Sequence, residues 1–432
     1  MTPTVGYIPY TGTGHSAEAE WLQDHLSVPV QVARDVPSLN EGPLRQLPDV
    51  EFLHGTIREF LPLPAVVAEG PGGFLWGALL RAHGFSGTLT VLPYVNPRGW
   101  CDVAALASYR RFADRRDRVF LGSTPAAAVY QALGVETSVG EPYGIDDGLF
   151  TIRPGAARIR DQLRIPAGRV LLFAGRAQPD KDLYRLLRVS LKAQVLFSDL
   201  QIVIATHVVD RGYLDAARGL LRSSAGVHFV LDPAPEQLAD LYNVADAFVT
   251  ASTSHFETFG RAPAEALACG TAAVAPRYDG FAEVLAQPGG TLVDVEIDPA
   301  TGELRADEER LLRGIFDVLS APGQPPRHEV AATARRRFGR STTLRELGYL
   351  AGRAPRPPRT PVRPARLRLP DAWCEPLEEA GRRLPPAALA WMWNDCDHDR
   401  LGGYDHAFTS QVRRSLCVPP PVDDGQEVTT CR

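Results

Sequence analysis

Continuous apolar runs that alternate with helix-like segments recur twice along this chain of 432 residues. The runs do not alternate apolar with polar residues, which is typical of strands buried on both faces of a parallel sheet. The series therefore predicts an α/β chain with two consecutive doubly wound domains. The expected strands are residues 4–10, 28–33, 65–69, 88–95 and 118–123 in the first half, and 169–175, 200–206, 227–231, 246–252 and 272–276 in the second.

The chain has enough hydrophobic residues to build two cores, and its charge and apolar pattern argue against a nucleic acid partner and a transmembrane segment. Hydrophobic residues make up 44% of the chain, and the net charge of −5 gives no reason to expect nucleic acid binding. We find no apolar run that could span a bilayer and no secretory signal, so we expect a cytoplasmic protein without a transmembrane segment. The six cysteines include no Cys-x-x-Cys pair, so we predict free thiols, no metal site and no cofactor. Nothing in the sequence indicates the oligomeric state.

Changes in composition predict four parts. Residues 1–147 form a first domain, and residues 148–350 form a second whose last helices could pack back on the first. Residues 351–369 are rich in Pro and Arg and form an extended linker. A weak contact of this basic stretch (353–369) with an anionic membrane surface is the alternative. Residues 370–432 form a C-terminal extension that we expect to pack on the main body.

Two cations follow the first strand of the predicted second domain. Ligands of doubly wound domains bind beyond the carboxyl ends of the strands, where Arg176 and Lys181 lie in "FAGRAQPDKDL". They are suited to hold a pyrophosphate and to neutralise charge on a leaving group. Of the 46 basic residues only Lys181 and Lys192 are lysine, which suggests that a compact ammonium is needed at one of these positions. The alternative is an ordinary surface Arg and Lys.

A second feature is the stretch "HFETFGRAPAEALACG" at residues 255–270, which reads as a loop followed by a helix. Gly260 is a permissive helix entry, so Glu257 lies on the approaching loop and Glu265 on the first turns of the helix. The free backbone N–H groups near residues 259–262 make a positive pole between two carboxylates. This layout suits a ligand that carries both phosphate and hydroxyl groups. A capping role for Glu265 alone is the structural alternative.

These segments resemble a known family. "FAGRAQPDKDL", "LADLYNVADAFVTAS", "HFETFGRAPAEALACGTAAVAP" and "DGFAEVL" occur in this order. Together they are similar to the nucleotide-binding domain of retaining GT-B glycosyltransferases of the family-4 type, whose signature is a Glu-x7-Glu element. "YIPYTGTGHSAEAEWLQDHL" more weakly resembles the family's N-terminal Gly-rich loop and first helix. The resemblance covers roughly residues 4–350 and implies two Rossmann-like domains that face a cleft, followed here by a C-terminal extension.

The resemblance also implies roles for single residues. Arg176 and Lys181 match the basic pair that binds the donor diphosphate, and Glu257 matches the glutamate near the donor sugar. We treat these three as the catalytic set. Glu265 matches the glutamate that accepts hydrogen bonds from the ribose hydroxyls.

Further donor-binding positions are expected in both domains. The backbone amides of Phe259 and Gly260 would touch sugar or phosphate. Gly12 and Gly14 would let the first-domain backbone approach the donor, with His15 in the same loop.

The acceptor side departs from the family pattern. Many relatives carry a histidine after the fourth N-terminal strand, where this chain reads "VLPYVNPRGW" and offers Tyr94 or Asn96. Trp76 and Trp100 could stack on an acceptor, although burial in the core is the more common fate of tryptophan.

The resemblance predicts a retaining, metal-independent transfer of a sugar from a nucleoside-diphosphate sugar to a hydroxyl-bearing acceptor. The expected acceptor is a small molecule or glycoside in a bacterial biosynthetic pathway, such as a natural product. Two alternatives stay open: a pseudo-glycosyltransferase or epimerase on the same scaffold, and a catalytically silent subunit that binds nucleotide sugar.

Overall fold

The computed structural model contains two compact units. Unit 1 comprises Met1–Asp146, His255–Phe259 and Arg336–Ser415, and unit 2 comprises Asp147–Ser254, Gly260–Arg335 and Leu416–Arg432. The sequence predicted domain boundaries after residues 147 and 350, whereas the partition falls after residues 146 and 335. The residues that the structure describes are 4–9, 23–24, 29–33, 50–140, 144–221, 226–255, 257–298, 303–320, 325–342, 365–369, 371 and 406–419.

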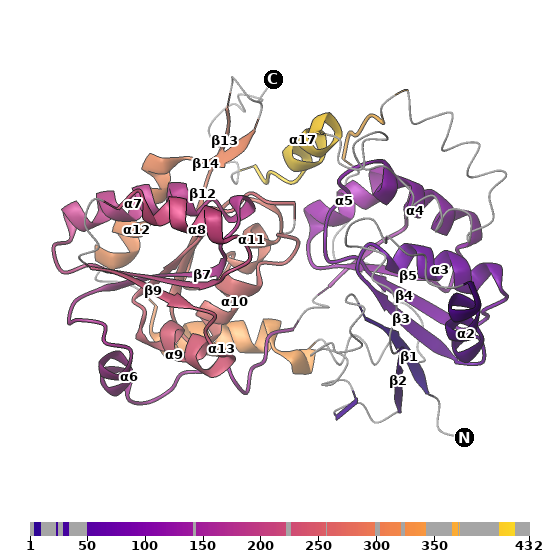
Figure 1. The fold of residues 1–432 in the computed structure, drawn as a ribbon, viewed down its shortest axis with the longest axis horizontal. Coiled ribbons are helices and arrows are strands. Elements are labelled where there is room, and N and C mark those ends of the chain that lie inside the picture. The colour runs from indigo at the N-terminus through magenta and orange to yellow at the C-terminus, as the bar shows by residue number, and fades with distance from the viewer. Residues whose placement is uncertain are drawn as a thin grey trace. The chain divides into compact units, whose positions relative to one another are not determined.

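The described strands of unit 1 form one parallel sheet of six strands in the order β2-β1-β3-β4-β5-β6 (Figure 1). The order reverses between β1 and β3, and the carboxyl ends of two such strands are where a doubly wound domain binds ligands. The strands are β1 (Val5–Ile8), β2 (Val30–Val32), β3 (Ala65–Glu69), β4 (Thr88–Leu92), β5 (Arg118–Leu121) and β6 (Ser138–Val139). The helices between them include α2 (Val50–Phe60), α3 (Gly73–Ala82), α4 (Trp100–Phe112) and α5 (Thr124–Ala132).

Two glycines let α3 lie directly on this sheet. A Cβ at Gly73 would lie 2.8 Å from the carbonyl oxygen of Ala68, and one at Gly77 would lie 2.8 Å from Leu89. No larger residue fits without displacing backbone or core. The close packing fixes the turn after β3, and with it the last residue of that strand, Glu69.

Unit 2 contains the second parallel sheet, whose six described strands run in the order β12-β11-β10-β7-β8-β9 (Figure 1). The reversal of strand order lies between β7 and β10. The strands are β7 (Val170–Arg176), β8 (Gln201–His207), β9 (Val227–Leu231), β10 (Ala247–Val249), β11 (Ala272–Pro276) and β12 (Gly290–Val293). A two-stranded antiparallel sheet, β13 (Val295–Ile297) and β14 (Leu304–Ala306), follows β12.

The helices of unit 2 cover the faces of this sheet, and several of them place the residues discussed below. They are α6 (Ala156–Gln162), the 3₁₀ turn η1 (Pro179–Lys181), α7 (Leu183–Leu196), α8 (Arg211–Arg218), α9 (Pro235–Val244), α10 (Arg261–Ala268), α11 (Asp279–Val284) and α12 (Glu308–Ser320). Helix α13 (Arg327–Phe338) begins in unit 2, and the partition into units falls within it. None of the helices described in either unit is both long and apolar enough to cross a membrane.

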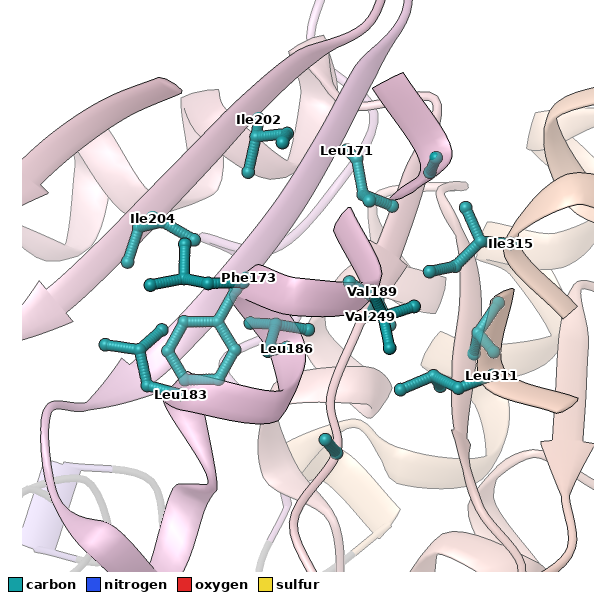
Figure 2. Packing of buried hydrophobic residues seen from close by; sticks show 14 of the residues in the cluster. Leu171, Phe173, Leu183, Leu186, Val189, Ile202, Ile204, Val249, Leu311 and Ile315 are labelled. Carbon is teal, nitrogen blue, oxygen red and sulfur yellow. The ribbon is translucent and has the colours of Figure 1, made fainter. Parts of the chain in front are cut away.

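The core of unit 2 anchors β7. Figure 2 shows Leu171 and Phe173 of this strand among buried side chains from neighbouring elements. Those neighbours include Ile202 and Ile204 of β8, Leu183, Leu186 and Val189 of α7, and Leu311 and Ile315 of α12. Burial of each such side chain is worth roughly 1.5–3 kcal/mol. The strand is therefore held firmly up to its last residue, Arg176.

The C-terminal extension contributes buried residues to both units. Helix α17 (His406–Ser415) contacts α5 in unit 1, where Phe408 and Val412 are fully buried. In unit 2, the backbone amide of Asp279 donates to the carbonyl of Leu416 at 2.9 Å, and Leu416 is also fully buried. These parts of the extension are therefore structural components of the units.

The prediction of an α/β chain with two doubly wound sheets is confirmed, and each expected strand overlaps an observed one. Strands β6, β12, β13 and β14 were not predicted. They are two to four residues long, and most of their residues are half-buried or exposed. They therefore lack the continuous apolar run by which the other strands were predicted.

Candidate functional site

The turn after β7 in unit 2 carries both predicted cations. Arg176 is the last residue of β7, and its side chain is 41% exposed although it contacts Asp180 at 3.1 Å. Lys181 ends the 3₁₀ turn that follows, before Asp182 caps α7 by accepting from the amide of Arg185. The turn therefore keeps two cationic side chains within six residues at the carboxyl edge of the sheet.

A hydrogen bond ties this turn to the neighbouring strand. The hydroxyl of Ser252, which follows β10, donates to the carbonyl of Asp180 at 2.9 Å. Because the strand order reverses between β7 and β10, the bond spans the switch point of the sheet. Arg176 and Lys181 thus lie where a doubly wound domain is expected to bind its ligand.

The start of α10 lies on the same edge of the sheet, one connection after β10. Its N-cap, Gly260, has φ of 90° and makes no side-chain cap. A Cβ at Gly260 would also lie 2.8 Å from the ring of Phe281. The structure thus places the start of α10, whose first amides the sequence predicts to bind an anion, after β10 at this edge of the sheet.

Glu265 is held by a residue that the sequence analysis did not identify. The hydroxyl of Tyr242, in α9, donates to Oε2 of Glu265 at 3.1 Å, and the glutamate is 8% exposed. Burial and then the charge of Glu265 raise the pKa of Tyr242 well above its usual value. The same two causes raise the pKa of the Cys269 thiol to about 12. A carboxyl group is therefore held in a defined position on the first turns of α10.

The two glutamates of the Glu-x7-Glu element fall in different units. Glu265 belongs to unit 2, whereas the segment His255–Phe259, which includes the 9% exposed Glu257, groups with unit 1. There the backbone amide of Asn96 donates to the carbonyl of His255 at 3.0 Å. The hydroxyl of Thr258 donates to the carbonyl of Tyr94 at 2.9 Å. The structure therefore brings the loop that carries Glu257 together with the predicted acceptor residues Tyr94 and Asn96.

Unit 1 also contains a carboxylate at its own switch point. Glu69 ends β3, is 3% exposed, and accepts hydrogen bonds from the hydroxyls of Tyr7 in β1 and Tyr94 after β4. Sequence reasoning missed Glu69 and Tyr7. The available signal was an acid placed directly after the buried run "AVVA", at the carboxyl end of a strand.

Other predicted site residues are buried in the core or lie outside the residues that the structure describes. Trp76 of α3 is 2% exposed and Trp100 at the start of α4 is 5% exposed, so both rings lie in the core of unit 1. Phe259 is also buried, with its ring 5.7 Å from that of Phe338 in an edge-on contact. Gly12, Gly14 and His15 lie outside the residues that the structure describes.

Each unit therefore offers a distinct chemistry. In unit 2, two cations and a helix terminus suit phosphate oxygens, and a buried carboxylate suits sugar hydroxyls. Unit 1 combines tyrosine hydroxyls with a carboxylate, which suits hydroxyl groups. Within the described ranges, no group of three or more His, Cys, Asp and Glu side chains is placed to hold a metal ion.

Comparison with known sequences finds matches for part of the chain. Residues 156–306 match the family model "Glycosyl transferases group 1". A D-inositol 3-phosphate glycosyltransferase of Arthrobacter sp. (strain FB24) is 33% identical over 246 residues, which cover 53% of this chain and 54% of that protein. A GDP-mannose-dependent alpha-(1-6)-phosphatidylinositol dimannoside mannosyltransferase of Mycobacterium tuberculosis (strain ATCC 25177 / H37Ra) is 30% identical over 185 residues, or 43% and 47% of the two chains. The matches thus span about half the length of these relatives.

Solved structures resemble a larger part of the chain. HepE of Anabaena, in complex with UDP and glucose, gives a TM-score of 0.61 at 19% identity, covering 80% of this chain and 98% of that one. Sucrose-phosphate synthase of Thermosynechococcus elongatus gives 0.62 at 19% identity, covering 81% and 98%. At such identities the likeness establishes the fold, which is GT-B. The resemblance that the sequence suggested is confirmed: the fold is GT-B, and residues 156–306 match the group 1 glycosyl transferases.

Proposed function

We propose that this protein transfers a sugar from a nucleoside-diphosphate sugar to a hydroxyl-bearing acceptor. The observation that carries the proposal is the arrangement at the switch point of unit 2. Arg176, Lys181 and the start of α10 all lie on one edge of the sheet, and Glu265 follows on the same helix. This set provides for phosphate charge and for sugar hydroxyls in a single domain.

In this proposal unit 2 binds the donor. The diphosphate lies against Arg176, Lys181 and the amides at the start of α10, and the ribose hydroxyls donate to Glu265. Relatives support such a donor, since one is named GDP-mannose-dependent and HepE has been solved with UDP-glucose. The transferred unit is accordingly a hexose, while the base is left to experiment.

The chemical step is departure of the diphosphate from the anomeric carbon. Negative charge grows on the leaving phosphate oxygen, where two fixed cations and a helix terminus stabilise it more than in the ground state. We infer that these residues take the part that a divalent metal plays in other transferases. We also infer that the acceptor hydroxyl attacks on the face that the diphosphate leaves, with retention, and that Glu257 contacts the donor sugar. The acceptor is a small molecule or glycoside.

The first test is a thermal-shift panel of UDP, GDP, ADP, CMP and dTDP. At 100 times its Kd, a nucleotide that binds the folded protein alone stabilises it by about 2.7 kcal/mol, which raises the melting temperature by several degrees. We expect one nucleotide to stabilise the wild type and to lose most of this effect in Glu265→Gln. The matched control is Glu309→Gln, an exposed glutamate on α12 of the same unit.

The outcome identifies the donor or rejects the proposal. If no nucleotide shifts the wild type, or if Glu265→Gln responds as Glu309→Gln does, the donor site is wrong. Once the nucleotide is known, Lys181→Ala should retain the fold and lower kcat, because the ammonium acts most strongly on the charge of the leaving group. Consumption of donor that yields an isomerised sugar nucleotide in place of a glycoside would favour the epimerase alternative.

A further inference from the structure

A buried carboxylate at the switch point of unit 1 is not used by the donor chemistry above. Glu69 lies at the carboxyl end of β3 beside β1, where the strand order of this sheet reverses. It is 3% exposed and Tyr7 is 1% exposed, whereas Tyr94 is half-buried. Because both phenols donate to Oε1 of Glu69, the three side chains form one cluster in which Tyr94 is the member that reaches solvent.

The backbone of Tyr94 is held in an unusual conformation. Its φ is 52°, in the left-handed region that residues other than glycine seldom adopt. Hydrogen bonds hold the chain at Tyr94 and directly after it: the hydroxyl of Thr258 donates to the carbonyl of Tyr94, and the hydroxyl of Tyr130 donates to the carbonyl of Val95. Such strain persists only where the surroundings enforce it, and it concentrates at functional sites. In this conformation Tyr94 donates to Glu69, at the edge of the sheet where a doubly wound domain is expected to bind its ligand.

The hydrogen bonding of the cluster determines what it can recognise. A phenol whose proton is donated to a carboxylate presents its oxygen lone pairs, so it accepts hydrogen bonds from a ligand. Hydroxyl groups can supply those protons, but a phosphate dianion cannot. The charge of Glu69 also repels a phosphate placed at this position, and its burial weakens screening by salt.

We propose that Tyr7, Glu69 and Tyr94 form an acceptor subsite that selects a hydroxyl group carrying no phosphate, on a sugar or cyclitol. Tyr94 contacts the acceptor, and Glu69 and Tyr7 are positioning residues that orient the phenol and set the sign of the local charge. This inference rests on the proposed function. It distinguishes the chain from relatives whose names specify a phosphorylated acceptor, such as D-inositol 3-phosphate.

The test uses matched acceptor pairs with the donor identified by the nucleotide panel. The probes are myo-inositol with D-inositol 3-phosphate, and glucose with glucose 6-phosphate. We expect the wild type to glycosylate at least one unphosphorylated member at a higher kcat/KM than its phosphorylated partner. Tyr94→Phe should raise the acceptor KM about tenfold or more, the usual worth of a hydrogen bond within a charged network, and leave the donor KM unchanged.

The Glu69→Gln variant tests the effect of the negative charge of this side chain separately from the effect of its shape. The amide keeps an oxygen for the phenols but removes the negative charge, so the preference for the unphosphorylated partner should fall about tenfold. The matched control is Tyr109→Phe. Tyr109 belongs to another buried phenol–carboxylate pair of unit 1, with Asp117 just before β5, at the opposite edge of the sheet. This control should lose a comparable hydrogen bond and keep both the acceptor KM and the preference.

Three results would overturn the inference while nucleotide binding stays intact. They are preference for the phosphorylated partner in the wild type, no transfer to any unphosphorylated probe, or acceptor kinetics of Tyr94→Phe and Glu69→Gln that match Tyr109→Phe. Absence of any nucleotide shift in the wild type would instead reject the proposed function, and this inference with it. The nucleotide panel therefore distinguishes the two failures.

Discussion

At the scale of single residues, Gly260 is a position in the proposed donor site that tolerates no side chain without strain. Its φ of 90° is strained for any side chain, and an added Cβ would lie 2.8 Å from the ring of Phe281. Gly260→Ala should therefore destabilise the protein by about 1–3 kcal/mol and shift the first amides of α10. We expect a lower melting temperature and weaker nucleotide binding, measured by calorimetry on the wild type and the variant.

Gly55, in α2 of unit 1, provides the matched control. A Cβ there meets no atom within 4 Å, so Gly55→Ala should stabilise the helix by about 0.5–1 kcal/mol and leave nucleotide affinity unchanged. If Gly260→Ala bound nucleotide as tightly as Gly55→Ala does, the helix start would not contact the diphosphate.

Candidate site residues could be predicted where they lie close together along the chain, and they were missed where only the fold brings them together. Arg176 ends a buried strand and Lys181 ends the short turn that follows it, so both could be proposed from the local sequence. The bonds of Glu69 join residues that are 62 and 25 positions away in sequence. No local pattern specifies which tyrosines a strand order will bring to that carboxylate.

At the scale of elements, one arginine holds the ends of two helices together. Arg327, at the start of α13, donates to the carbonyls of Asn243, Ala245 and Cys269 at 2.9–3.2 Å. These carbonyls lie at the C-terminal ends of α9 and α10, where the helix dipoles are negative. Burial lowers the pKa of Arg327, and the nearby charge of Asp246 opposes this shift. It also lines a cavity of about 260 Å³ with Arg169 and Asp246.

Replacing Arg327 should destabilise unit 2 without removing a residue of the proposed donor site. Arg327→Met leaves three helix-terminal carbonyls without their donor, and we expect a loss of about 3 kcal/mol in the free energy of unfolding. Urea titration measures it, with Arg313→Met as the control because that side chain is 81% exposed. Equal stability of the two variants would show that water replaces the guanidinium at no cost.

A strand could be predicted from the sequence when it carries a continuous run of apolar residues. The continuous runs of β3 and β8 are buried along most of their length and were identifiable directly. Strand β12 is four residues long and mostly half-buried, and it follows Gly289 with φ of 84°. This segment forms a strand because it pairs with β11, and such pairing depends on the tertiary structure and not on the local sequence.

At the scale of the whole molecule, the C-terminal extension stabilises the two units through different residues. Phe408 and Leu416 are both fully buried, the first in unit 1 and the second in unit 2. Truncation of such side chains to alanine costs about 2–5 kcal/mol. Because the partition assigns their contacts to separate units, Phe408→Ala should chiefly destabilise unit 1, and Leu416→Ala should chiefly destabilise unit 2.

Hydrogen exchange followed by mass spectrometry measures this directly, because it reports protection peptide by peptide. In Phe408→Ala we expect faster exchange in β3, β4 and α5, and in Leu416→Ala in β11 and α11, which adjoin Leu416 through Asp279. A nucleotide that binds unit 2 should restore protection in the second variant and have little effect on the first. Equal loss across both units in either variant would show that the extension couples them into one cooperative structure, so that a nucleotide bound to unit 2 would also stabilise unit 1.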